Sequence, residues 1–215
     1  MTKPLIAQHL DKFLDDIVPS RPAEMVEMEA HAKELQFPII GPACGYLCYQ
    51  IARMIGAKKV FELGSGFGYS TAWFAKAVVE NGGGVVYHVV WDDELSQRAR
   101  RHLRVLKLDG VVEYRVNEAV QALHDEPGPF DLIFNDIDKQ GYPAALPVIA
   151  EKLRPGGVMI VDNLLWQGRI FDADDRDAST EGIREFTRRV RSDPTWISSI
   201  IPIRDGLLVA YKQSP

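Results

Sequence analysis

The sequence has little or none of several features that mark particular protein classes. Only two of its 215 residues are cysteines, which excludes a disulfide-built scaffold. No apolar run reaches the ~18 residues of a membrane-spanning helix, and residues 1–16 mix charged and apolar residues without the apolar core of a signal peptide. With 25 basic against 30 acidic residues, the chain also lacks a basic stripe for nucleic acid. We expect a soluble, cytoplasmic protein that binds neither membranes nor nucleic acid.

Nothing in the composition divides the chain. No Ser/Gly/Pro-rich linker, internal repeat or low-complexity segment interrupts it, and a chain of this length can bury about 70% of its unfolded surface in one core. We predict one domain over residues 1–215, with residues 1–40 as an N-terminal helical extension. Cys44 and Cys48 stand four residues apart, which suits two small buried side chains on one helix face.

Hydrophobic periodicity predicts an α/β fold. Amphipathic spacing indicates helices at 4–18, 22–36 and 42–56. Short apolar runs at 60–63, 85–90, 111–116, 130–134 and 158–161 then alternate with helical stretches near 69–80, 94–107, 118–124, 142–154 and 177–192. This alternation predicts a parallel sheet with helices on both faces. Two last apolar runs flank Arg204-Asp205-Gly206, a turn signal that predicts an antiparallel pair at the end of the chain.

A glycine-rich turn follows the first predicted strand. Open α/β sheets bind ligands beyond the carboxyl ends of their strands, and Gly64, Gly66 and Gly68 let the backbone turn tightly there and approach a ligand. Tyr69 stands where a dinucleotide fingerprint has its third glycine, which makes a nicotinamide dinucleotide less favoured. A purely structural turn remains the alternative.

Acidic and amide side chains follow two other predicted strands. Asp136 and Asp138 come after the fourth strand, and Asp162 with Asn163 after the fifth. Carboxylate and amide oxygens suit Mg²⁺ or Ca²⁺. The alternative is a set of solvated loop acids, with Asp162 capping a helix.

Four segments, 60–75, 130–142, 153–170 and 202–212, together resemble the cation-dependent, S-adenosylmethionine-dependent O-methyltransferases typified by catechol and caffeoyl-CoA O-methyltransferases. The resemblance implies a Rossmann-like class I methyltransferase fold, with a seven-stranded, mostly parallel sheet, a C-terminal antiparallel hairpin and N-terminal helices. It also implies a homodimer. The implied activity is methyl transfer from S-adenosylmethionine to a hydroxyl of a catechol-like, vicinal dihydroxy aromatic small molecule, assisted by a divalent cation.

The resemblance also implies roles for individual residues. Cofactor contacts fall on Ile40, Glu62, Gly64, Gly66, Ser70, Ala119, Asp136 and Asp138. Metal ligands fall on Asp136, Asp162 and Asn163, for Mg²⁺ first and Ca²⁺ or Mn²⁺ as alternatives. The catalytic residues fall on Asp136 and on Lys139, which follows it by three residues and matches the family's candidate general base, while Trp166 lines the acceptor pocket. The plain alternative for Lys139 is a surface lysine paired with Asp138.

One position departs from the family pattern. The acid that usually holds the ribose at the end of the second strand is Val90 here, and a valine side chain accepts no hydrogen bond. Because side chains alternate along a strand, Asp92 would point to the same side and substitute for it. Two other functions stay open: a catalytically weakened relative that binds S-adenosylmethionine with altered ribose contacts, and a nucleotide-dependent oxidoreductase.

Overall fold

The computed structural model of the protein describes residues 5–214, with side chains from residue 9. The predicted start of the first helix, at Pro4, lies outside the described residues. Three helices come first: α1 (Leu5–Asp16), α2 (Ala23–Glu34) and α3 (Gly41–Met54). The sequence predicted all three helices, and both ends of each helix lie within two residues of the predicted ends. Cys44 and Cys48 are buried and unbridged in α3, as their spacing indicated.

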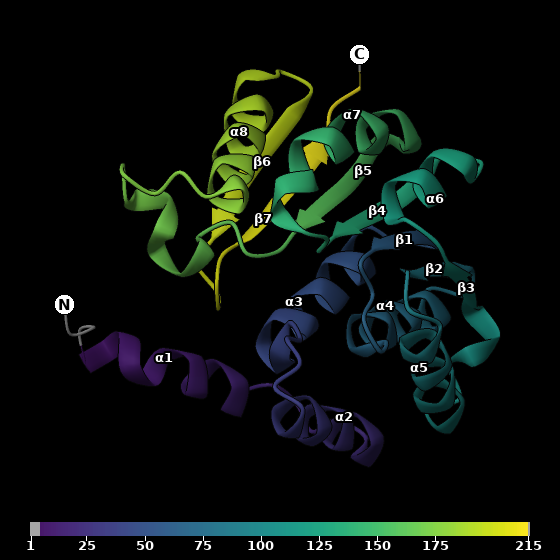
Figure 1. The fold of residues 1–215 in the computed structure, drawn as a ribbon. Helices are drawn as coiled ribbons and strands as arrows, with labels where there is room; N and C mark the ends of the chain where they lie inside the picture. The colour runs from purple at the N-terminus through teal and green to yellow at the C-terminus, as the bar shows by residue number, and fades with distance from the viewer. Residues whose placement is uncertain (1–4, 215) are drawn as a thin grey trace.

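A seven-stranded sheet with the order β3-β2-β1-β4-β5-β7-β6 forms the centre of the molecule (Figure 1). Its strands are β1 (Lys59–Leu63), β2 (Val85–Val90), β3 (Val112–Val116), β4 (Phe130–Asn135), β5 (Leu153–Val161), β6 (Trp196–Ile201) and β7 (Leu207–Lys212). The first five strands are parallel, whereas β7 is antiparallel to both β5 and β6. The mostly parallel sheet and its C-terminal antiparallel hairpin are confirmed.

The remaining helices connect the strands. They are α4 (Tyr69–Glu80), α5 (Asp93–Val105), α6 (Ala119–Asp125), α7 (Tyr142–Lys152) and α8 (Ala178–Ser192). In Figure 1, α3, α4 and α5 lie on one face of the sheet, and α6, α7 and α8 on the other. None of the helices in residues 5–214 combines the length and apolar character that crossing a membrane requires.

The start of β5 was predicted wrongly. The helix was expected to reach residue 154 and the strand to begin at 158, but α7 ends at Lys152 and β5 begins at Leu153. Arg154 precedes Pro155, and the proline ring disfavours helical backbone in the residue before it. Three short 3₁₀ helices were also not predicted: η1 (Asp109–Val111), η2 (Lys139–Gly141) and η3 (Trp166–Phe171).

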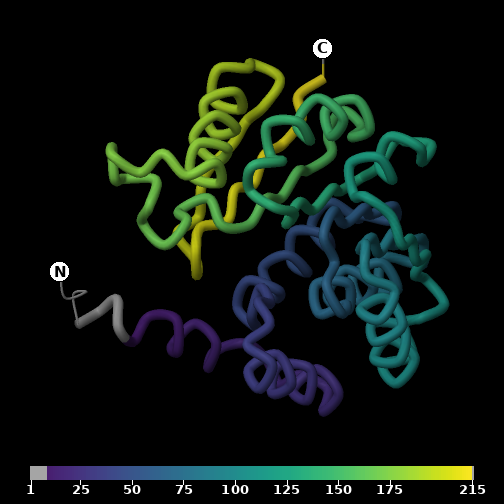
Figure 2. The backbone as a smooth tube through the Cα atoms, in the orientation of Figure 1, coloured from purple at the N-terminus to yellow at the C-terminus, as the bar shows by residue number. Residues whose placement is uncertain are grey.

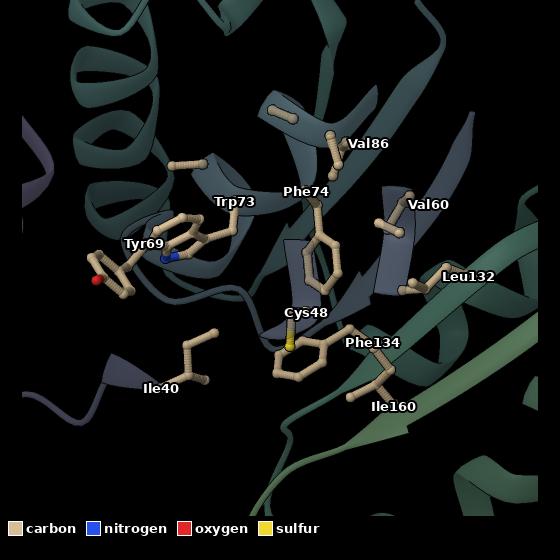
Figure 3. Packing of buried hydrophobic residues seen from close by; sticks show 14 of the residues in the cluster. Ile40, Cys48, Val60, Tyr69, Trp73, Phe74, Val86, Leu132, Phe134 and Ile160 are labelled. Atoms are coloured by element: carbon tan, nitrogen blue, oxygen red, sulfur yellow. The ribbon is translucent and has the colours of Figure 1, made fainter. Parts of the chain in front are cut away.

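Alternating strand residues build two apolar clusters, one on each face of the sheet. Val60, Leu132 and Phe134 pack with α3 and α4, where Phe74 and Cys48 meet Phe134 (Figure 3). Side chains of the other face, which include Phe61, Leu63, Ile133 and Met159, pack with α6, α7 and α8. The central strands β1 and β4 are almost wholly buried between these clusters, and that packing positions the groups at their ends.

Topology places two features beside the strand ends. The strand order reverses between β1 and β4, and such a switch point opens a crevice at the carboxyl ends of the strands. The antiparallel course of β7 brings the β6–β7 turn back to the carboxyl end of β5, where Gly206 O accepts from Leu164 N at 2.9 Å and Asp205 O from Leu165 N at 2.8 Å. In the trace of Figure 2, the loop after β5 and this turn lie on the same side of the molecule.

Candidate active site

A cleft of about 1630 Å³ lies at the carboxyl ends of the five parallel strands. Ten of the predicted site residues line it: Ile40, Gly64, Gly66, Ser70, Ala119, Asp136, Asp138, Lys139, Asn163 and Trp166. Glu62 and Asp162 are fully buried next to its walls, and Asp92 does not line it. The structure thus gathers residues from both halves of the chain around one space.

The glycine turn between β1 and α4 forms one wall. Gly64 has a φ of +86°, and a Cβ on it would lie 2.5 Å from the carbonyl oxygen of Asp136, so only glycine lets the ends of β1 and β4 approach this closely. Ser65 ties the same turn to β2, because its N–H donates to Val89 O and its hydroxyl accepts from Val89 N, both at 2.9 Å. The turn is therefore held in place by backbone contacts to two neighbouring strands.

Glu62 lies on β1, fully buried, and neither carboxylate oxygen has a hydrogen-bond partner. Burial raises its pKa to about 7, although the nearby hydroxyls of Ser70 and Thr71 favour the charged form. A buried carboxylate without a partner is costly in the free protein. A cationic ligand group next to β1 would relieve that cost.

Asp136 and Lys139 form a pair in the opposite wall. Lys139 Nζ donates to Asp136 Oδ1 at 2.7 Å and to Ile137 O at 3.2 Å, and only 11% of its side chain is exposed. Burial raises the pKa of Asp136 to about 6, and the Lys139 charge opposes that rise. The alternative of a surface lysine paired with Asp138 is wrong, because the backbone turn entering η2 brings Lys139 back onto Asp136.

Asp162 pairs with a residue that was not predicted to belong to the site. Its Oδ1 accepts from Asn163 N at 2.8 Å, and its Oδ2 accepts from the guanidinium of Arg204, in the β6–β7 turn. The alternative role of Asp162 as a helix cap is not seen, since no helix begins directly after it. The sequence indicates Arg204 only as part of a turn signal, and its charge within that turn is the one local clue to a role in the site.

Asn163 is turned toward Asp205. Its side-chain Nδ2 donates to Asp205 Oδ2 at 3.3 Å, while Asp205 Oδ1 accepts from Gln167 N at 2.6 Å. Within residues 5–214, no group of three or more His, Cys, Asp or Glu side chains is placed to hold a metal ion. One of the three predicted metal ligands, Asn163, is an amide and falls outside that grouping. The hydrogen bonds of the three side chains therefore decide whether they can hold a metal ion.

Those contacts do not leave an open metal site. The donors are chemically suitable for a hard cation, but Lys139 holds Asp136 and Arg204 holds Asp162. The amide of Asn163 is engaged with Asp205. As arranged, the three predicted ligands do not fit a divalent cation.

Asp92 has a different position from the one expected. Strand β2 ends at Val90, and the chain turns at Asp92, whose Oδ1 accepts from Leu95 N at 3.0 Å and caps α5. Because β2 ends at Val90, the alternation of side chains does not extend to Asp92, and its contact with the ribose stays a prediction. Val90 itself lines the cleft, and both carboxylate oxygens of Glu118 cap α6.

Trp166 and the acidic loop after it close the far end of the cleft. Trp166 lies with its ring centroid 6.0 Å from Lys139 Nζ. Arg184, on α8, donates to the backbone carbonyls of Ile170 at 3.2 Å and Asp175 at 2.7 Å. This guanidinium fastens the loop to α8, a positioning role that periodicity could not reveal.

Known proteins with similar sequences and structures share this arrangement of elements. The family model described as O-methyltransferase matches residues 21–213. "Catechol O-methyltransferase domain-containing protein 1" of Mus musculus is 32% identical over 77% of this chain and 64% of its own length. "Catechol O-methyltransferase" of Niastella koreensis is 27% identical over 95% of this chain and 97% of its own.

A solved structure agrees with the sequence matches. The O-methyltransferase from Bacillus cereus, in complex with SAH, superposes with a TM-score of 0.85 at 26% identity, covering 95% of this chain and 97% of that one. Together with the family match over residues 21–213, this confirms both the predicted methyltransferase fold and the predicted enzyme class. The chain belongs to the O-methyltransferase family.

Proposed function

We propose that this protein transfers a methyl group from S-adenosylmethionine to a hydroxyl of a catechol-like, vicinal dihydroxy aromatic acceptor. The observation that carries the acceptor class is Lys139, whose Nζ lies 2.7 Å from Asp136 and 6.0 Å from the ring centroid of Trp166. An aromatic wall next to a buried cationic group suits an aromatic ring that carries an ionisable hydroxyl. The Niastella koreensis relative is named for this acceptor class.

The glycine wall supports S-adenosylmethionine as the methyl donor. Gly64, Gly66 and Ser70 line the cleft at the start of α4, and the orphaned carboxylate of Glu62 suits a cationic ligand group. When bound, S-adenosylmethionine supplies a methyl group on a positively charged sulfur, which an oxygen nucleophile can attack. The Bacillus cereus structure in complex with SAH supports the same assignment.

The remaining chemistry is assigned to residues of the chain. Lys139 acts as the general base: after its ammonium proton passes to Asp136 along their 2.7 Å hydrogen bond, Nζ accepts the acceptor's hydroxyl proton. The resulting ammonium is then held by Asp136 Oδ1 and Ile137 O. Trp166 fixes the plane of the acceptor ring and excludes water from one side of it. Positioning of this kind brings the oxygen to the methyl group in a reactive arrangement.

A divalent cation is not part of this proposal. Its predicted ligands Asp136 and Asp162 are each paired with a basic side chain, so no step is assigned to a metal. The positive charge that stabilises the deprotonated acceptor is assigned to Lys139 and Arg204.

A second function is favoured by one observation. Val90 lines the cleft, and the acids near it, Asp92 and Glu118, use their carboxylates as helix caps. A protein without an acceptor for the ribose hydroxyls would bind S-adenosylmethionine weakly. The second proposal is therefore a catalytically weakened relative that binds the cofactor with altered ribose contacts.

A methyl-transfer assay over matched acceptors separates the two. We expect turnover of a catechol and little turnover of the corresponding monophenol, because only the catechol presents a second oxygen to the cationic pair. Calorimetric binding of S-adenosylmethionine without turnover of any acceptor would support the weakened relative. Turnover of the monophenol at the catechol rate would contradict the vicinal dihydroxy class.

We also propose the homodimer that the resemblance implied. Leu10 and Phe13 of helix α1 are exposed, as is Ile17 directly after it, and neighbouring exposed apolar side chains suit an interface with another chain. Light scattering after size-exclusion chromatography measures the mass directly. A monomer mass at the concentration used in the activity assay would contradict this proposal.

A further inference from the structure

Arg204 differs from the other charged groups of the site because its backbone is constrained independently of its side chain. Its φ is +51°, a left-handed conformation that is unfavourable for a residue with a Cβ. The turn is joined to the loop after β5 by hydrogen bonds from Leu164 and Leu165, and a Cβ at Gly206 would lie 2.5 Å from Leu165 Cγ. The turn is therefore fixed against β5, and the guanidinium is delivered to Asp162.

The guanidinium contacts one of the predicted metal ligands directly. It donates to Asp162 Oδ2, and the other oxygen of Asp162 accepts from Asn163 N. Arg204 also lines the cleft, with 33% of its side chain exposed. The group therefore neutralises the buried carboxylate and has further N–H donors at the cleft where the acceptor is proposed to bind.

Two acids of this wall are each matched by a basic side chain. Asp136 pairs with Lys139 and Asp162 with Arg204, while Asp138 and Asp205 add negative charge beside the cleft. Without Lys139 and Arg204, Asp136 and Asp162 would leave a strongly negative site that favours a divalent cation. With both basic side chains present, an incoming divalent cation meets like charge and must first break both ion pairs.

From this arrangement we infer that Arg204 serves as a built-in cation in place of a divalent metal ion, binding the acceptor oxygens and making methyl transfer independent of added metal. The inference rests on the proposed function for its catalytic part only. A guanidinium is always charged in proteins and donates to oxygens in a planar fork. The guanidinium of Arg204 and the ammonium of Lys139 can therefore hold the two oxygens of a vicinal diol by donating hydrogen bonds to them.

Metal binding tests the inference without any turnover. Wild-type protein, Arg204→Gly and the double variant Arg204→Gly/Asp162→Asn are titrated with Mn²⁺, and the free ion is measured by electron paramagnetic resonance. Glycine suits the left-handed backbone at this position. We expect Arg204→Gly to bind one Mn²⁺ per chain at least about tenfold more tightly than wild type, and the double variant to lose that gain. Arg188→Ala, an exposed arginine on α8, is the matched control and should behave as wild type.

Two outcomes of the titration would overturn the inference. One is stoichiometric Mn²⁺ binding by wild type as tight as by Arg204→Gly, and the other is a folded Arg204→Gly that gains no affinity. Circular dichroism reports the fold. If the glycine variant does not fold, Arg204→Asn takes its place, because asparagine tolerates positive φ.

A second measurement needs only the wild-type protein. Methyl transfer to a catechol is expected to be the same, within about twofold, with EDTA and with Mg²⁺. Activity that disappears in EDTA and returns with Mg²⁺ would overturn the inference. The absence of turnover in both conditions would count against the proposed function instead, and the Mn²⁺ titration would still decide the role of Arg204.

Discussion

The wall of the cleft at the ends of β1 and β2 is built from backbone and from apolar and small polar side chains next to one buried, unpaired carboxylate, Glu62, whereas the wall at β4, β5 and the β6–β7 turn presents paired charges. On the first wall, Val90 faces the cleft and Asp92 is used as a helix cap. On the second, Lys139 holds Asp136 and Arg204 holds the buried Asp162. The first wall can bind its ligand through shape and one unpaired charge, and the second can change the ionisation of whatever it binds.

The largest effect is expected from the charged wall. Lys139→Met removes the group proposed to accept the acceptor proton, so kcat should fall by about 10²–10⁴-fold, with little change in S-adenosylmethionine affinity. Lys152→Met is the matched control, since Lys152 is also mostly buried and donates to a backbone carbonyl, Glu126 O at 3.1 Å, at the far end of α7. Steady-state kinetics check both, and an unchanged kcat for Lys139→Met would contradict its catalytic role.

The two walls also differ in how far the sequence predicted them. The glycine turn could be predicted because Gly64 and Gly66 act locally, within a few residues of the strand they follow. Arg204 could not, because its contact with Asp162 exists only after β7 has paired with β5 in the sheet. Hydrophobic periodicity predicts that β6 and β7 form a hairpin, but it does not predict that β7 pairs with β5 and so brings Arg204 to Asp162.

Local errors had local causes. The plain alternative for Lys139 was a pair with Asp138, but the turn into η2 brings its ammonium to Asp136. The alternation of side chains was carried from Val90 to Asp92, although the strand ends at Val90. The fold as a whole was predictable because alternating strands and helices leave few topologies. The hydrogen-bond partners of individual side chains were less predictable, because they depend on the residue at which each helix or strand ends.

The next largest effect is expected on the glycine wall, where a substitution tests the close approach between Gly64 and the backbone of Asp136. Gly64→Ala should lower the free energy of unfolding by about 3 kcal/mol, from left-handed strain and from contact with the Asp136 carbonyl. Gly82→Ala separates these causes, because Gly82 has a φ of +93° but open space around it. It should cost only about 1 kcal/mol. Urea unfolding measures both, and equal losses would show that the close approach contributes nothing.

Glu62 gives the third effect, which depends on pH. Its pKa is raised from 4.5 to about 7 in the folded protein, so the folded state binds a proton that the unfolded state has lost. This contribution to stability is complete below pH 4.5, is lost as the pH rises to about 7, and is absent above it.

Glu62→Gln removes that dependence. The stability of the variant minus that of wild type should rise by about 3 kcal/mol across this range, while its affinity for S-adenosylmethionine falls. Glu27→Gln, on the exposed face of α2, is the control and should show a flat difference. Unfolding at a series of pH values provides the measurement, and a constant difference for Glu62→Gln would contradict the raised pKa.

The smallest effect separates a structural acid from a ligand-binding one on the glycine wall. Asp92→Ala removes the cap of α5, so the free energy of unfolding should fall by about 1 kcal/mol. The affinity for S-adenosylmethionine should stay within about twofold, because the Asp92 side chain does not line the cleft. Asp93→Ala is the control, since Asp93 accepts only from the exposed Gln97 side chain and should cost a few tenths of a kcal/mol. Calorimetry decides the question: a marked loss of affinity in Asp92→Ala alone would mean that this acid reaches the ribose after all, and that the first wall binds through a second charge besides Glu62.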